Sequence, residues 1–507
     1  MTAVSPTIAS VSPVTGEIVA SALIQETEGV AAAVSAASLM AREWAAKTPT
    51  ERARHLLRIR ESFADRGDAI AESTSAETGK PLADAWAEVL TACSMWGWAA
   101  RQGPRLLSSR RIGAGPLVVK RARVHYEPYG VVGVIAPSNY PVVVPMQSIP
   151  SALAAGNTVV FKPSQRTLRT GQLIAEAINS AGIELVHVIT GDGQTGEALA
   201  RSAVQKLVFT GSPGVGRAVV GAAAWSLTPV VLQVGGKASA IVCRDADLGR
   251  AVRTVVGAAF TNAGQLGAAT ERVYVVSAVY DEFVERVVEL TRQLRVGPQP
   301  DADFGPLARP EQAVVLESRL LDAECAGARI LVGGRRRDDF PAVYFEPTVV
   351  VDVNPDMVLM QHASPGPVLT IMRVETPEDA AALVNMAAYA QNASVFTRDE
   401  RHGRRVAAKL SVDWVHINDA LVGHTVSGEP LVGLRASGSG RYDVRTGVLE
   451  FSRTKTVLSD RGRWMSYVAG MLMTERLRGP AALSRIASMR YSSERLTKRL
   501  QTRRARA

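Results

Sequence analysis

Cysteine is scarce in this sequence, with only Cys93, Cys243 and Cys325 among 507 residues. The three are widely separated, so their spacing matches neither a disulfide framework nor a structural zinc site. We therefore expect no disulfide, no bound metal and a reducing, cytoplasmic environment. Cys243 ends the apolar run that starts at Ala240 and is expected to be a buried strand residue.

Long hydrophobic runs are also missing. No stretch of about 18 or more apolar residues occurs, which argues against a membrane-spanning helix. The segment Met1–Ser21 lacks the basic and then apolar order of a secretory signal peptide, and the chain has no internal repeat or low-complexity linker. What it does have is 47% hydrophobic residues, enough for two or three domains with sizeable cores.

Positive charge gathers at one end of the chain. The formal net charge is +10, yet residues 459–507 hold 12 Lys and Arg against 3 Asp and Glu, a surplus of 9. The remainder is therefore close to neutral, at about +1. This distribution argues against a nucleic-acid groove across the body, and no specific nucleic-acid target is expected.

The basic tail, residues 459–507, also carries apolar residues at roughly helical spacing, among them Trp464, Tyr467 and Leu496. This pattern predicts amphipathic helices. Three roles stay open for the tail. Its helices pack on the body or on a partner subunit, or they bind an anionic membrane surface and make the protein peripheral at a membrane. In the third, the last stretch, residues 498–506, is a disordered arm that contacts acidic partners or nucleic acid.

Two successive α/β regions follow a helical start. Residues 28–106 carry apolar side chains at helical spacing, and residues 129–232 alternate short β-branched runs with helical windows. That alternation predicts a doubly wound parallel sheet, and a second α/β region is expected over residues 235–434. The predicted strands of the first region are Val131–Ile135, Thr158–Phe161, Val186–Ile189 and Lys206–Phe209.

Several short motifs resemble those of one known family. Phe260-Thr-Asn-Ala-Gly-Gln-Leu-Gly267, with Arg272 after it, resembles the nucleophile loop of the aldehyde dehydrogenase superfamily, and the resemblance extends over about residues 12–458. Further matching motifs are Glu77-Thr-Gly-Lys-Pro81, Ala136-Pro-Ser-Asn-Tyr-Pro141, Ala155-Gly-Asn-Thr-Val-Val-Phe-Lys162, Phe209-Thr-Gly-Ser-Pro-Gly-Val-Gly216, Leu232-Gln-Val-Gly-Gly-Lys237 and Phe451-Ser-Arg-Thr-Lys455.

The resemblance implies an α/β fold of the aldehyde dehydrogenase type, close to NAD(P)-dependent semialdehyde and aldehyde dehydrogenases. Residues 1–109 and 129–232 would form a Rossmann-type cofactor domain, and residues 233–434 a catalytic-type domain. An oligomerisation β-ribbon would comprise residues 110–128 and 435–458, with the basic tail after it. In the family this ribbon completes a sheet across subunits, so a homodimer or a dimer of dimers is expected.

Four positions that carry the family's chemistry are altered. Gly267 stands where the family keeps its catalytic Cys, and glycine has no side chain to attack a carbonyl; the structural interpretation is a tight loop that needs glycine. Gln233 replaces the general base Glu, and an amide cannot accept a proton near neutral pH. Ala363 replaces the carboxylate that clamps the nicotinamide ribose. Pro365 stands where an aromatic wall is usual.

Other positions keep the family pattern. Asn139 matches the amide donor that stabilises the developing oxyanion, although it also shapes its loop. Lys162 matches the adenosine-ribose lysine, and Ser212 matches the residue near the pyrophosphate. Gln165 would tolerate NADP, while the glycines Gly211 and Gly216 alone are a weak signal. We expect NAD or NADP to bind weakly or not at all.

Three functions remain open on the sequence. The first is a family member that has lost aldehyde oxidation and acts as a scaffold or regulator. The second is a non-redox enzyme for a small carbonyl or acyl compound, with Asp419 and His424 near Asn139 and with Tyr140 and His362 facing the same funnel. The third is an NAD(P)-dependent aldehyde dehydrogenase with an atypical site.

Overall fold

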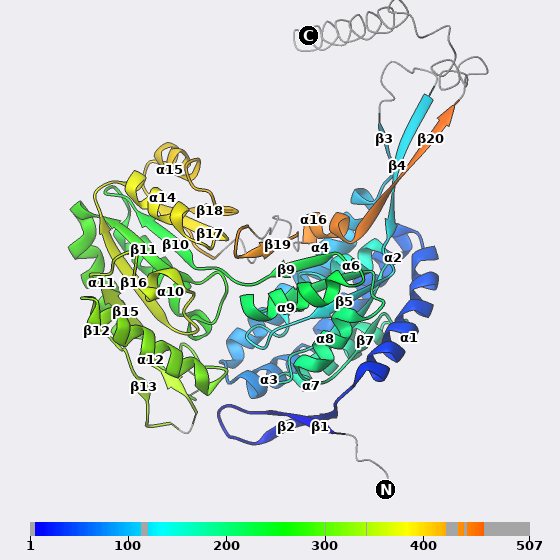
Figure 1. The fold of residues 1–507 in the computed structure, drawn as a ribbon, viewed down its shortest axis with the longest axis horizontal. Helices are drawn as coiled ribbons and strands as arrows, with labels where there is room; N and C mark the ends of the chain where they lie inside the picture. Colours follow the sequence, from blue (N-terminus) through cyan, green and yellow to red (C-terminus); the bar gives the residue numbers. More distant parts are fainter. Residues whose placement is uncertain are drawn as a thin grey trace, which may run out of the picture. The chain divides into compact units, whose positions relative to one another are not determined.

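The computed structural model describes residues 6–112, 120–299, 301–340, 342–421, 434–440 and 444–460 (Figure 1). The chain divides into two compact units, one made of Met1–Leu106 with Pro128–Phe451 and the other of Leu107–Glu127 with the chain from Ser452 onward. His424 and the tail beyond residue 460 lie outside the described residues. Within those residues, no helix combines the length and the apolar character that crossing a membrane requires.

The N-terminal part of the first unit is helical, as predicted. A hairpin of β1 (Thr7–Val11) and β2 (Ile18–Leu23) leads into four helices. The second helix starts on a capping box, in which Thr48 and Glu51 each satisfy the other's backbone N–H. The helices are α1 (Thr27–Ala46), α2 (Pro49–Asp65), α3 (Gly67–Thr78) and α4 (Leu82–Leu106).

The first sheet is doubly wound, as predicted. Its strand order is β19-β9-β8-β5-β6-β7, and all neighbours are parallel except β19 against β9. The chain starts in the middle at β5, runs outward to β7 and returns to β8 on the other side, so the direction of winding changes between β5 and β8. Ligands bind at the carboxyl ends of the strands at such a switch point. The strands and the helices around them are β5 (Val131–Ile135), α5 (Val143–Met146), α6 (Ile149–Ala155), β6 (Thr158–Lys162), α7 (Leu168–Asn179), β7 (Val186–Val188), α8 (Gly193–Arg201), β8 (Lys206–Thr210), α9 (Pro213–Ala224), β9 (Val230–Gln233) and β19 (Gly438–Ser439).

The second sheet has the order β12-β15-β16-β11-β10-β17-β18, with only β12 antiparallel to its neighbour. Its strands are largely buried and rich in Val and Ile, as expected for a sheet covered on both faces. The elements are β10 (Ala238–Val242), α10 (Leu248–Phe260), η1 (Thr261–Gly264), β11 (Thr270–Val276), η2 (Ser277–Val279), α11 (Tyr280–Arg292), α12 (Pro310–Cys325), β12 (Arg329–Val332), β15 (Thr348–Val351), α13 (Val358–Gln361), β16 (Val368–Val374), α14 (Pro377–Met386), β17 (Asn392–Phe396), α15 (Glu400–Ala407) and β18 (Trp414–Ile417), with β13 (Arg336–Arg337) and β14 (Tyr344–Phe345) as a separate hairpin.

The second unit holds a three-stranded sheet of order β20-β4-β3, formed by β3 (Arg110–Ile112), β4 (Lys120–Pro128) and β20 (Ser452–Asp460). The sequence predicted that the second segment of this ribbon starts at residue 435, but in the structure it starts later. Residues 438–439 pair with β9, and α16 (Val444–Glu450) packs on α4 and α6. The ribbon therefore takes over only after Phe451, whose ring is fully buried in the first unit.

Asn157 fastens this end of the first unit. Its side-chain oxygen accepts from the backbone N–H of Gly130 at 2.9 Å, and its amide nitrogen donates to the carbonyls of Ala152 and Phe451, both at 2.9 Å. The side chain is fully buried, so none of these bonds has water as a substitute. One residue thus joins the start of β5, the middle of α6 and the end of α16.

We predict that Asn157→Ala lowers the free energy of unfolding by about 3 kcal/mol, because three buried hydrogen bonds are worth roughly 1 kcal/mol each. Chemical denaturation followed by far-UV circular dichroism measures the change. The matched control is Asn385→Ala, which removes two hydrogen bonds at a solvent-exposed place, to the Lys409 carbonyl and the Ser411 N–H. Equal effects for the two variants would contradict the account.

Candidate functional site

A cavity of about 1250 Å³ opens in the first unit at the carboxyl ends of β5, β6 and β8. This is the place at which the winding of the first sheet predicts a ligand. The loop between η1 and β11 forms part of its opposite wall. Ten residues singled out from the sequence line it together: Asn139, Tyr140, Lys162, Gln165, Gly211, Ser212, Gln233, Gly267, Ala363 and Pro365.

The loop that carries Gly267 is tightly wound. Asn262, Ala263 and Gly264 have φ of 51°, 55° and 69°, so three successive residues adopt the left-handed conformation. For a residue with a Cβ, such as Ala263, this costs about 1–2 kcal/mol. Gly264 also lies against Gly366, whose carbonyl oxygen would be only 2.5 Å from an added Cβ. The turn needs glycine at position 264.

Gly267 itself is not under that constraint, which corrects the expectation that its loop needs glycine there. Its φ lies outside the left-handed region, so its backbone carries no left-handed strain. An added Cβ would meet the Cα of Gly235 at 3.2 Å and Oε1 of Gln391 at 3.9 Å. A small side chain at position 267 therefore needs the Gly235 backbone to shift by a few tenths of an ångström.

Asn139 holds the same loop in place. Its side-chain amide donates to the carbonyl of Gln265 at 2.7 Å, and its own carbonyl accepts from the Asn262 side chain at 3.0 Å. Lys80 Nζ donates to that carbonyl as well, at 2.8 Å. One N–H of the predicted oxyanion donor is thus used by the loop, which supports the structural role of this residue.

No cysteine of the chain takes the place of the expected thiol beside this loop, and an amide stands at the position of the expected base. Gln233 Oε1 accepts a hydrogen bond from the Thr210 hydroxyl at 3.1 Å, a local contact of the kind expected for an amide. The cysteines are elsewhere: Cys93 is half-buried on α4, Cys325 is exposed and Cys243 is fully buried, and none lines the cavity. Burial raises the pKa of the Cys243 thiol to about 12, away from that of a nucleophile.

A buried ion pair beneath the cavity was missed by the sequence reasoning. Lys80 Nζ contacts Glu88 Oε1 at 2.5 Å with both side chains almost fully buried, and Lys80 lies over the ring of Tyr140 at 4.2 Å. Glu88 also accepts from the backbone N–H groups of Val142 and Val143, both at 3.0 Å. Burial raises the pKa of the Tyr140 hydroxyl, with the Glu88 charge acting in the same direction. The pair fixes the backbone that carries Asn139.

Lys162 is a nearly buried cation in the wall of the cavity. Its side chain is 6% exposed, lines the cavity and forms no ion pair among the described residues; Nζ donates a long hydrogen bond to the Pro163 carbonyl at 3.5 Å. Burial lowers its pKa to about 8, although the charge of Asp192 acts the other way. Nearby, α9 begins at Ser212, whose side chain makes no cap hydrogen bond, so the first N–H groups of α9 remain available to an anion.

The region of the lost ribose clamp contains a different carboxylate. Glu271 lines the cavity and binds Lys237 at 2.6 Å and the backbone N–H of Ser364 at 2.7 Å. Four nearly buried lining residues also present polar atoms without a partner. They are Gln147 Oε1, Gln312 Oε1, Ser364 Oγ and Gln391 Oε1. None of them was predicted, because no motif or spacing singles out a lone amide or hydroxyl.

Four other candidates do not line the described cavity. Gly216 serves packing, since an added Cβ would lie 2.6 Å from Cγ1 of Val234. Asp419 is absent from the lining and its Oδ1 accepts from the Ala420 N–H at 2.6 Å. His362 is exposed at the end of α13, contrary to the expectation that it faces the funnel. His424 lies outside the described residues, so its predicted place stays a prediction.

Comparisons with known proteins agree with this geometry. A model of the aldehyde dehydrogenase family matches residues 1–457. The chain is 33% identical over 476 residues to the 4,4'-diapolycopene aldehyde oxidase of Methylomonas sp., which covers 91% of this chain and 89% of that protein.

Solved structures give the same result. An NAD-dependent aldehyde dehydrogenase from Sinorhizobium meliloti superposes with a TM-score of 0.87 at 31% identity, covering 91% of this chain and 93% of that one. The NADP-dependent glyceraldehyde-3-phosphate dehydrogenase of Bacillus halodurans C-125, complexed with NADP, has a TM-score of 0.85 at 31% identity, covering 90% and 96%. The fold is thus that of an aldehyde dehydrogenase. The chain belongs to the aldehyde dehydrogenase family.

We predict that Gly267→Ala changes the free energy of unfolding by no more than about 1 kcal/mol, whereas Gly264→Ala lowers it by about 2–4 kcal/mol. The first substitution meets only a mild contact, while the second places a Cβ against a backbone carbonyl in a left-handed residue. Paired denaturation curves measure both. A Gly267→Ala variant as unstable as Gly264→Ala would contradict the conclusion that position 267 accepts a side chain.

Proposed function

We propose that this protein is an aldehyde dehydrogenase family member that has lost aldehyde oxidation through a thiol intermediate and retains a weakened nucleotide site with a scaffold or regulatory role. One observation carries the proposal. Gly267 stands at the nucleophile position, in a loop that would accept a side chain, and no cysteine lines the cavity. Without a thiolate there is no covalent adduct from which hydride could leave.

The adenosine and pyrophosphate half of NADP fits the residues present. Lys162 is a nearly buried cation without a counter-ion, and the α9 N-terminus beside Ser212 offers unpaired N–H groups to a phosphate. Gln165, which also lines the cavity, brings no negative charge to repel a 2′-phosphate. When bound, NADP would supply a hydride acceptor, but these residues only bind and orient it.

The nicotinamide half fits less well. Ala363 offers no carboxylate to the ribose, and Pro365 offers no aromatic face. Loss of a charge-assisted hydrogen bond costs about 1.5–3 kcal/mol, which is roughly a tenfold to hundredfold weakening. Glu271 lies near this region, but its Oε2 is already bound by Lys237 and the Ser364 N–H. We therefore expect binding that is weak, with a loosely held nicotinamide.

The repurposed non-redox enzyme has less support. That reading requires Asp419 and His424 to converge on Asn139, and Asp419 is not among the described residues that line the cavity. Asn139 still faces the cavity, however, and keeps the second N–H of its amide for a small carbonyl or acyl ligand. We propose that such a ligand binds at the site without being converted.

Assembly and location belong to the same proposal. The ribbon of β3, β4 and β20 carries surface charges such as Glu127 with Arg453 and Lys455, which protect an edge in a monomer, and pairing with a second copy would satisfy its backbone. We propose a cytoplasmic homodimer or dimer of dimers. The basic tail remains a proposed contact for a protein partner or a membrane surface.

Calorimetric titration tests the nucleotide site. We predict binding of NADP⁺ and NAD⁺ that is weak but measurable, and loss of at least about tenfold in affinity in Lys162→Met, because its charge-assisted contacts disappear. The matched control is Lys409→Met, which removes an exposed lysine that is paired with Glu378 far from the lining. No binding up to millimolar nucleotide would refute the nucleotide site and leave the loss of oxidation standing.

The pKa of Lys162 sets a pH dependence. Its pKa in the folded protein is lowered to about 8, so the side chain loses its charge as pH rises from 7 to 9, and NADP⁺ affinity should fall over that range. The stability of the nucleotide-free protein changes with pH in the opposite direction. The unfolded chain keeps this proton up to its ordinary pKa, so stability gains from Lys162 as pH rises from about 8 toward 10.5. Calorimetric titrations with NADP⁺ at several pH values measure the change in affinity. An affinity that depends on pH equally in the wild type and in Lys162→Met would contradict the prediction.

A further inference from the structure

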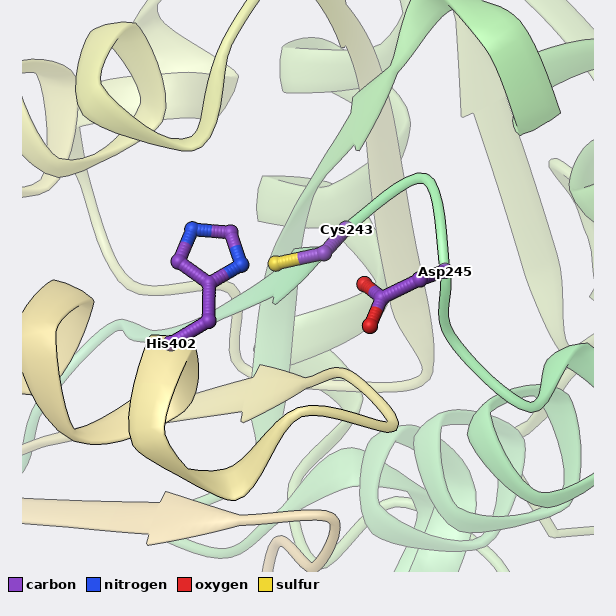
Figure 2. A group of neighbouring side chains, drawn as sticks. All are labelled: Cys243, Asp245 and His402. Atoms are coloured by element: carbon purple, nitrogen blue, oxygen red, sulfur yellow. The ribbon is translucent and has the colours of Figure 1, made fainter.

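Cys243, Asp245 and His402 form a cluster outside the cavity. Cys243 directly follows β10, Asp245 lies in the loop that leads to α10, and His402 is on α15. Their possible ligand atoms all lie within 4.8 Å of one another. Figure 2 shows the three side chains pointing toward a common centre, with the sulfur between the imidazole ring and the carboxylate. None of the three lines the cavity, so the cluster is separate from the proposed nucleotide site.

We propose that Cys243, Asp245 and His402 form a binding site for a divalent transition-metal ion of the Zn²⁺ type. Ligand atoms around one such ion sit about 2.0–2.3 Å from it and hence roughly 3.5 Å from each other. The ligand atoms of the cluster lie within 4.8 Å of one another, so one ion can contact all three once the ligands close around it. Asp245 is held by its hydrogen bonds, so that adjustment falls on His402, which is half-buried on α15.

The donor chemistry selects the ion. A thiolate and an imidazole favour Zn²⁺, Co²⁺ or similar ions, whereas Mg²⁺ and Ca²⁺ prefer oxygen ligands. Once the Cys243 proton has left for solvent, Cys243 and Asp245 carry two negative charges that balance a divalent cation. Three protein ligands leave a fourth position for water or an added ligand.

The surroundings already orient the carboxylate. Both oxygens of Asp245 accept from the Thr397 hydroxyl, at 3.0 and 2.9 Å, and Oδ2 also accepts from the N–H groups of Arg398 and Asp399, both at 3.1 Å. Hydrogen-bonded ligands of this kind are usual at metal sites. The same bonds hold the loop after β17 whether or not an ion is bound, so they fix Asp245 near Cys243 in advance.

Cys243 is fully buried directly after β10, which is an inner strand of the second sheet. Burial and the charges of Asp245 and Glu378 raise its pKa, so the thiol is protonated without a metal. A bound cation would reverse that, and metal binding should release one proton and strengthen as pH rises.

Cobalt titration of the full-length, tag-free, reduced and chelator-treated protein tests the site. We expect a near-ultraviolet thiolate-to-cobalt absorption band that saturates at one Co²⁺ per chain, that Zn²⁺ abolishes by displacement, and that Mg²⁺ and Ca²⁺ leave unchanged. Cys243→Ser should lose the band, while the matched variants Cys93→Ser and Cys325→Ser keep it.

A second variant guards against misfolding, because Cys243 lies in the core. His402→Gln changes a half-buried residue of a surface helix and should fold normally, yet bind Co²⁺ at least about tenfold more weakly, since even loss of an outer-shell partner costs that much. Absence of the band in wild type, its survival in Cys243→Ser, or unchanged affinity in His402→Gln would each overturn the proposal.

Discussion

The exchange of amide hydrogen bonds between Asn139 and the loop at 262–265 is the contact on which the site depends. Asn139 donates to the Gln265 carbonyl and accepts from the Asn262 side chain, so two loops from different sheets are held by one residue. Lys80, which is paired with Glu88, donates to the backbone carbonyl of Asn139. This arrangement stabilises a turn of three left-handed residues, which would otherwise be a costly conformation.

That constraint underlies our proposal that the frame of the site persists without thiol chemistry. A covalent mechanism requires a thiol at position 267, whereas the turn is held by contacts of Asn139, Asn262 and Gly264. In this proposal the cavity keeps its shape, while positions 267 and 233 carry a glycine and an amide where a thiol and a carboxylate would act. Two carboxylates of the cavity wall, Glu88 and Glu271, are each bound to a lysine. Lys162, which also lines the cavity, forms no ion pair among the described residues.

Much of this was predictable from the sequence, since the signals were local. The β-branched runs around Val131 and Lys206 predicted strands of the first sheet, and the motif glycine Gly211 marked the cavity wall. Other features depend on contacts between distant residues. The last strand of the ribbon begins only after Phe451, whose carbonyl is held by the side chain of Asn157. The cluster of Cys243 with His402 likewise joins residues that are far apart in the chain. Single orphaned amides such as Gln391 leave no pattern in a sequence at all.

The central claim is that the cavity lost catalysis at a few positions while its frame survived. Aldehyde-dependent reduction of NADP⁺, followed by absorbance over a panel of aldehydes, tests this in wild type beside a variant that combines Gly267→Cys, Gln233→Glu and Ala363→Glu. We expect no reduction above the buffer rate by wild type and a measurable burst by the restored variant. Aldehyde-dependent reduction by the wild-type protein would contradict the account.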